Sequence, residues 1–289
     1  MLGKAFSIRE AFKFGWSKSI EHLFLLLKVA IVVFIVELVL SLGFVPLGLF
    51  LKMTQNSYLS VIPLVLTFGY MLAVTLCTIG MIRLGLLRVL FDIYERNTSE
   101  VMRLFSSFNL VLTYLFAFIL FSLCLLLLIL VCALPLALIG VIVGITGATL
   151  TMVSFIMSIV LFILWIILNA RLGFYPYPIV DTKSTAIASL VRSYEITRGS
   201  VLRIIIFEIL LGLIPVIFSF IAILNLAAAV TAVSQGWYIA AIVPTFLALC
   251  ALFCVALMIP FVLLANVYVY KKLAEYYDHH VALIPFQEE

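Results

Sequence analysis

The sequence predicts an all-α polytopic membrane protein with six transmembrane helices, arranged as three hairpins that are each preceded by an amphipathic surface helix. Three observations lead to this fold class. First, 66% of the 289 residues are hydrophobic and only 10% are charged, whereas a soluble domain carries about 25% charged residues. Second, the apolar residues form runs long enough to cross a bilayer, which takes about 20 residues per helix. Third, short amphipathic stretches precede the first, third and fifth of these runs.

Residues 1–22 predict the first surface helix. Ser7 and Glu10 have the spacing of a capping box, in which two side chains bond free backbone N–H groups of the first turn. An apolar stripe follows at helical spacing and consists of Ile8, Ala11, Phe12 and Gly15. The run from Leu23 to Pro46 is long enough to span a bilayer and shows no signal-peptide cleavage site, so we expect it to be retained as the first span.

The second surface helix is predicted between spans two and three. Span two covers about 59–82, and we expect its helix to continue as far as Arg96. Asn97 and Glu100 then repeat the capping-box spacing. A second stripe follows and consists of Val101, Leu104, Phe105 and Phe108. Span three is predicted over about 110–134.

Span four is predicted over about 150–170, after a glycine-rich turn at 140–147. Pro176 and Pro178 follow it closely. Proline lacks the N–H group that a helix interior needs, so we expect the helix to end before these residues. The chain then has room to turn back along the membrane surface.

The third surface helix has the clearest pattern. It follows Asp181 and ends before Gly199, a residue type that commonly closes helices. Its apolar stripe consists of Ile187, Leu190, Val191 and Tyr194. We expect this helix to lie on the membrane. Spans five and six are predicted over about 201–223 and 238–265, with kinks at the prolines inside them, Pro215 and Pro260.

The basic residues fix the expected orientation. Four Lys and Arg residues lie in 1–22, four in 83–103, five in 171–203, and two at positions 271 and 272. Loops that carry excess Lys and Arg stay on the cytoplasmic side. Both termini are therefore predicted to be cytoplasmic.

The three hairpins resemble successive copies in the same orientation, which would make a parallel pseudo-repeat within a single integral membrane domain over 1–289. Arg83-Leu84-Gly85 recurs as Arg171-Leu172-Gly173, each at the end of an even-numbered span. The alternative is that amphipathic helices before spans are a common feature of helical membrane proteins. The expected units cover about 1–96, 97–180 and 181–280, with a short tail at 281–289.

A short pattern before the fifth span resembles a known family. It consists of Ala188-Ser189-Leu190, Ser193 and Thr197-Arg198-Gly199. With it, the chain resembles the stand-alone bacterial relatives of the membrane domain attached to some glycerophosphoryl diester phosphodiesterases. The resemblance implies a six-span fold in the bacterial cytoplasmic (inner) membrane. The phosphodiesterase barrel of the fused relatives is absent from this sequence, so no catalytic residue carries over.

Three charged residues fall inside predicted spans: Lys28, Glu37 and Glu208. A charge at the centre of a bilayer costs about 2.5–3.5 kcal/mol on insertion scales. Lys28 and Glu208 have similar expected depths, so we expect them to pair, with Arg203 as a competing partner of Glu208. The alternative is that Lys28 extends its amine to the headgroups and that Glu208 is protonated or bonded to a neighbouring polar group. Glu37 lies deeper and is either a site for proton or substrate coupling or a satisfied acid inside the bundle.

Five arginines are candidates for contact with anionic lipid headgroups, each worth about 1 kcal/mol near such a surface. The alternative is that they express only the ordinary basic bias of cytoplasmic loops. The candidates are Arg83, Arg171, Arg192, Arg198 and Arg203.

The sequence carries no recognisable catalytic constellation, metal site or cofactor motif. The five cysteines lie in apolar runs without histidine nearby, as reduced core residues do. The net charge of +4 is modest and does not suggest nucleic acid. We therefore expect a non-enzymatic membrane protein that binds, senses or helps to move phospholipid, or that serves as a scaffold. The alternative is a small-solute or proton-coupled transporter or channel, and a homo-oligomer or a membrane-protein partner is compatible with both.

Overall fold

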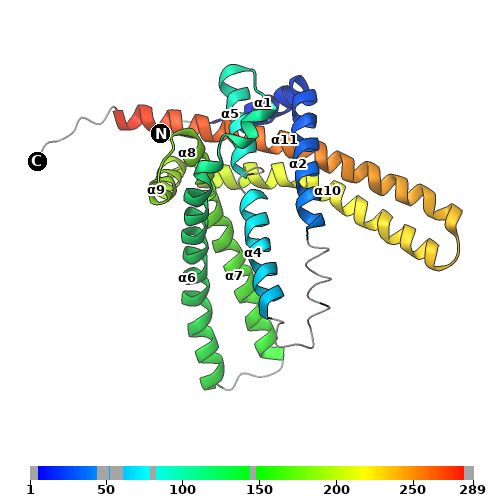
Figure 1. The fold of residues 1–289 in the computed structure, drawn as a ribbon. Coiled ribbons are helices and arrows are strands. Elements are labelled where there is room, and N and C mark those ends of the chain that lie inside the picture. The colour runs from blue at the N-terminus through cyan, green and yellow to red at the C-terminus, as the bar shows by residue number, and fades with distance from the viewer. Residues whose placement is uncertain (1–5, 44–51, 53–60, 79–82, 144–147, 283–289) are drawn as a thin grey trace, which may run out of the picture. The chain divides into compact units, whose positions relative to one another are not determined.

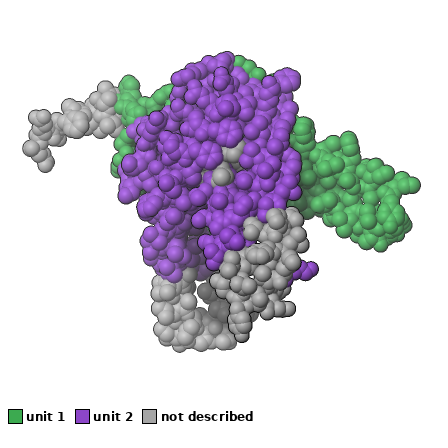
Figure 2. All heavy atoms as spheres, viewed as in Figure 1, with its two compact units in different colours: residues 1–21, 162–171, 194–289 green, residues 22–161, 172–193 purple. Residues whose placement is uncertain are grey.

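The computed structural model of this chain describes most of its residues, and every regular element in them is a helix (Figure 1). Backbone contacts divide the chain into two compact units, shown in Figure 2. Unit 1 consists of residues 1–21, 162–171 and 194–289, and unit 2 consists of 22–161 and 172–193. The described residues are 6–43, 52, 61–78, 83–143 and 148–282.

Five helices of the described part are long and apolar enough to cross a membrane. In Figure 1 they are α2 (Leu23–Leu42), α6 (Val111–Val143), α7 (Ala148–Leu172), α10 (Val201–Ser234) and α11 (Tyr238–Ala282). The predicted second span coincides with a further helix, α4 (Val61–Thr78). Its apolar segment Val65–Leu76 is shorter than the membrane-spanning segments of the five long helices. The sixth span and the threefold repeat therefore stay predictions.

The long helices turn most of their side chains outward. In the most apolar 18-residue segment of each of these five helices, between 6% and 24% of the segment is buried inside the protein. A helix that is apolar on all sides and uncovered by protein needs an apolar solvent around it. The packing of these helices thus agrees with their composition.

Unit 2 contains a packed layer of short helices. They are α5 (Leu86–Arg96), the 3₁₀ helices η3 (Val101–Phe105) and η4 (Phe108–Leu110), and α8 (Pro176–Asp181). α5 ends at Arg96, where the helix of the second span was expected to end, but residues 79–82 lie outside the described residues, so a continuous helix from α4 to α5 stays a prediction. Arg88 of α5 donates from Nη1 to the carbonyl oxygen of Val180, 3.1 Å away. Pro176 and Pro178 were predicted to end the preceding helix. They lie at the start of α8, because proline suits the first turn of a helix.

The second surface helix is shorter and tighter than predicted. η3 is a 3₁₀ helix of five residues, in which the N–H of Arg103 bonds the carbonyl of Glu100 at 3.1 Å. The hydroxyl of Ser106 donates to the carbonyl of Arg103 at 2.7 Å and so competes with an α-helical bond. Leu104 is buried, and its backbone lies close to Gly85. The expected α-helical stripe is therefore wrong here.

The predicted capping box of Asn97 and Glu100 is also wrong. Asn97 has a φ of 56° and closes α5, with its N–H bonded to the carbonyl of Ile93 at 3.2 Å. Asparagine tolerates this left-handed conformation better than most residues. Glu100 has an extended backbone and makes no side-chain cap bond to η3. The residues between them form a loop instead of a helix start.

In unit 1, α1 (Ile8–Glu21) packs against α11. The predicted stripe of α1 supplies the contact, since Ala11 and Gly15 are buried. A Cβ atom on Gly15 would lie 3.0 Å from both the Ala265 Cβ and the carbonyl oxygen of Phe261. Glycine therefore lets the two helices approach closely. Phe207 of α10 is fully buried, and the centre of its ring lies 5.8 Å from that of Phe12 on α1.

Both helices of the last hairpin exceed their predicted lengths. α10 continues to Ser234 instead of ending near 223, through a segment rich in leucine and alanine. Gly236, with a φ of 79°, turns the chain into α11. α11 continues past 265 as far as Ala282, because no glycine or proline interrupts that polar segment. Residues 281 and 282 of the expected 281–289 tail belong to α11, and 283–289 lie outside the described residues.

Candidate functional site

The charged residues of the predicted spans lie on two different units. Lys28 and Glu37 are exposed on α2 in unit 2, and Glu208 is half-buried on α10 in unit 1. Their proposed pairing across the bundle stays a prediction. Two cavities, near Asp92 and near Tyr238, include none of the three.

Two of the five candidate arginines have aromatic and backbone partners. The Arg171 guanidinium lies 4.8 Å from the centre of the Tyr194 ring. Arg203 lies 6.0 Å from the centre of the Phe6 ring, and its Nη1 donates to the Phe6 carbonyl at 3.5 Å. Arginine stacks on aromatic faces in this way and gains about 0.5–1 kcal/mol at exposed sites. These two arginines therefore make packing contacts within unit 1 in addition to carrying a positive charge.

The other three candidate arginines differ in accessibility. Arg83 and Arg198 are exposed, whereas Arg192 is half-buried. Arg198 follows α9 (Ala186–Thr197), and Gly199 next to it has a φ of 86°, as the predicted C-cap requires. Arg198 is therefore an accessible cation directly beside the third surface helix.

The apolar stripe of α9 faces outward. Ile187, Val191 and Tyr194 have relative exposures of 66%, 49% and 46%. The opposite face contains small and hydroxyl residues, and two of them, Ser189 and Ser193, have an exposure of 0%. In a water-soluble protein the distribution would be reversed, since large apolar residues are the ones that burial stabilises.

Two of the buried hydroxyls of α9, those of Ser189 and Thr197, are bonded to backbone carbonyls. Ser189 Oγ donates to the carbonyl of Ala186 at 2.7 Å. Thr197 Oγ1 lies 3.1 Å from the carbonyl of Tyr194 and 3.3 Å from that of Arg171. These bonded hydroxyls form the inner face of α9 together with the buried Ala186 and Ile196. The stripe lies on the other side of the helix, where Ile187 and Val191 are exposed.

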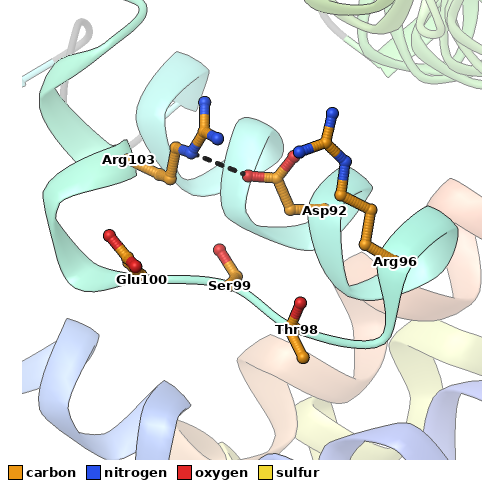
Figure 3. Close-up of a pocket in the computed structure, with 6 residues that line it drawn as sticks. All are labelled: Asp92, Arg96, Thr98, Ser99, Glu100 and Arg103. Atoms are coloured by element: carbon orange, nitrogen blue, oxygen red, sulfur yellow. Dashed lines mark ion pairs between the residues drawn. The ribbon is translucent and has the colours of Figure 1, made fainter.

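A polar pocket lies between α5 and η3 in unit 2. Figure 3 shows Asp92 between Arg96 and Arg103, with the loop from α5 to η3 below them. Asp92 Oδ2 lies 3.4 Å from Nε of Arg103. The pocket has a volume of about 230 Å³ and is lined by Asp92, Arg96, Thr98, Ser99, Glu100 and Arg103.

Sequence reasoning did not assign this pocket. The signal available to it was Asp92, an acidic residue between the apolar residues Phe91 and Ile93. Burial of a carboxylate at such a position calls for a cationic partner. The partner, Arg103, was counted only as part of the basic bias because the intervening residues were expected to start an α-helix.

The described residues contain no group of three His, Cys, Asp or Glu side chains that could hold a metal ion. Cys124, Cys132, Cys250 and Cys254 are free thiols there. Comparisons with protein families, curated proteins and solved structures find no match for this chain. The fold itself defines the class: this is a multi-pass helical membrane protein.

Proposed function

We propose that this protein is a phospholipid-interacting membrane protein that contacts lipid through the exposed face of α9. The observation that carries the proposal is the outward stripe of Ile187, Val191 and Tyr194. Exposed apolar patches on a helix mark a surface that another apolar phase covers. A helix with this arrangement and basic flanks lies in the plane of a membrane interface.

Chain connectivity favours lipid as the occupant of this face. The membrane helix α10 begins at Val201, and α9 ends at Thr197. Three linking residues extend at most about 3.5 Å each. The end of α9 therefore stays close to the bilayer surface, where lipid is the most abundant apolar neighbour.

Charge supports an anionic lipid. Lys183 precedes α9 and Arg198 follows it, and both are exposed. A basic residue near an anionic leaflet contributes about 1 kcal/mol of attraction. The predicted cytoplasmic location of this helix is the side on which basic residues gather.

The test compares two label positions on α9 in lipid nanodiscs. A fluorophore is attached to V191C or A188C in a variant that lacks the five native cysteines. Both native residues are exposed, but they lie about 60° apart around the helix because each residue turns it by about 100°. We expect spin-labelled lipid to quench the label at position 191 at least three-fold more than at 188. Equal quenching, or stronger quenching at 188, would contradict the proposal.

A second measurement tests the charge. Native mass spectrometry of the protein extracted in mild detergent should show bound anionic phospholipid, and Arg198→Gln should reduce it. Arg9→Gln removes the same charge from an exposed position on α1 and is the control. Equal lipid retention in the wild type and in Arg198→Gln would mean that Arg198 does not bind lipid and only contributes to the orientation of the protein in the membrane.

A further inference from the structure

The pocket between α5 and η3 has charges of both signs. Arg96 and Arg103 supply two guanidinium groups, and Asp92 and Glu100 supply two carboxylates. Arg103 and the buried Asp92 already form an ion pair at 3.4 Å. The exposed Arg96 and Glu100 remain as one cation and one anion facing the same pocket.

The loop adds hydroxyl donors to these charges. Thr98 and Ser99 line the pocket between the two exposed charged residues (Figure 3). Ser99 Oγ is buried and has no hydrogen-bond partner among the described residues. Leaving a buried hydroxyl unbonded is energetically unfavourable. An oxygen-rich group or water in the pocket would remove that cost.

The position of the pocket relates it to the membrane surface. Asn97 Oδ1 lies 3.1 Å from Nε2 of His22. His22 directly precedes α2, which begins at Leu23 and is apolar enough to cross a membrane. The loop that carries Thr98 and Ser99 is thereby fixed beside the start of a helix that is apolar enough to cross a membrane.

We propose that this pocket binds an aminoalkyl phosphate group, such as the phosphoethanolamine group. Arg96, with the hydroxyls of Thr98 and Ser99, holds the phosphate, because guanidinium and hydroxyl groups are strong donors to phosphate oxygens. Glu100 binds the ammonium group. A volume of about 230 Å³ accommodates such a group but not a lipid tail.

The charge balance selects this ligand class. A simple anion would meet Arg96 but also the carboxylates of Asp92 and Glu100, and a simple cation would meet two guanidinium groups. A group that carries both charges is favoured at both ends, which is how a site discriminates between ligands of similar size. This proposal does not depend on the exposed face of α9.

The first experiment uses soluble probes. The protein is placed in nanodiscs of phosphatidylglycerol and phosphatidylcholine, and O-phosphoethanolamine, inorganic phosphate and ethanolamine are titrated by calorimetry. We expect O-phosphoethanolamine to bind at least ten-fold more tightly than either of the other two. Phosphate binding as tight as that of O-phosphoethanolamine would mean a simple anion site and would overturn the proposal.

Variants assign the two ends of the ligand. Arg96→Gln should weaken O-phosphoethanolamine at least ten-fold, and Ser99→Ala about three-fold. Glu100→Gln should weaken O-phosphoethanolamine but not inorganic phosphate. The matched controls Arg9→Gln and Glu275→Gln change exposed charges in unit 1 and should leave both affinities unchanged. Equal losses in the controls and in the pocket variants would refute the assignment.

Lipid composition identifies the source of the group. If the natural ligand is a lipid headgroup, nanodiscs that contain phosphatidylethanolamine should compete with O-phosphoethanolamine and raise its apparent Kd. If it is a soluble metabolite, the apparent Kd should be the same in both lipids. Absence of soluble binding, together with no preferential retention of phosphatidylethanolamine by native mass spectrometry, would overturn the proposal.

Discussion

The Asp92 carboxylate and the Arg103 guanidinium lie 3.4 Å apart and connect α5 to η3. The Asp92 side chain has a relative exposure of 8% and that of Arg103 42%. Breaking a fully buried ion pair costs about 3–5 kcal/mol, and exposed pairs contribute about 0–1 kcal/mol. Because solvent reaches one partner, we expect Arg103→Met to lower the free energy of unfolding by about 1–2 kcal/mol. Thermal unfolding in detergent at matched lipid content measures the change.

A double-mutant cycle separates this pair from other effects of the substitution. In the Asp92→Asn background, Arg103→Met should cost less than in the wild type, because the buried charge is already gone. Equal costs in both backgrounds would show that Arg103 stabilises η3 by its packing alone.

Gly85 is the second residue that holds η3 in place. A Cβ atom at this position would overlap the carbonyl oxygen of Leu104. Overpacking of this kind typically costs about 1–3 kcal/mol, so Gly85→Ala should lower thermal stability clearly. Gly69→Ala in α4 is the control, since its Cβ would meet nothing within 4 Å. Similar stability in the two variants would mean that α5 and η3 are not in close contact.

The sequence was sufficient to predict the helical class and most of the long helices, because an apolar run of about 20 residues is typical of a membrane-spanning helix. It was also sufficient for the C-cap at Gly199, whose positive φ suits glycine. Ends of helices were less predictable. α11 continues past its predicted end at 265 because polar residues such as Lys272 and Glu275 also favour a helix, and these two pair at 2.7 Å.

The surface elements show what sequence periodicity leaves open. The stripes of α1 and α9 have the same spacing, yet Ala11 on α1 is buried and Ile187 on α9 is exposed. Periodicity identifies an apolar face but does not say whether protein or lipid covers it. The pocket at Asp92 could not be predicted from periodicity either. It depends on a 3₁₀ turn whose Leu104 contacts Gly85, and this contact joins residues far apart in the sequence.

Phe207 is the buried centre of an aromatic cluster in unit 1. Its ring lies edge-on to those of Phe6 and Phe12, with centroid distances of 6.0 and 5.8 Å. Large-to-small replacement of a buried phenylalanine costs about 3–5 kcal/mol. We expect Phe207→Ala to loosen α1, so that limited proteolysis cleaves the segment 1–21 faster. Phe220→Ala, an exposed position on the same helix, should leave the cleavage rate near that of the wild type.

Glu37 distinguishes the lipid-interacting function from the transporter alternative. It is exposed on α2 and does not line the pocket at Asp92 or the cavity near Tyr238. A charged group in a membrane helix is costly unless it has a role, so removing one without a role should be harmless. We expect Glu37→Gln to keep or raise thermal stability, to leave lipid retention unchanged, and to leave proton flux across proteoliposomes at the protein-free level in both proteins. A wild-type flux that Glu37→Gln abolishes would establish the transporter alternative, because no step of lipid contact through α9 uses this carboxylate.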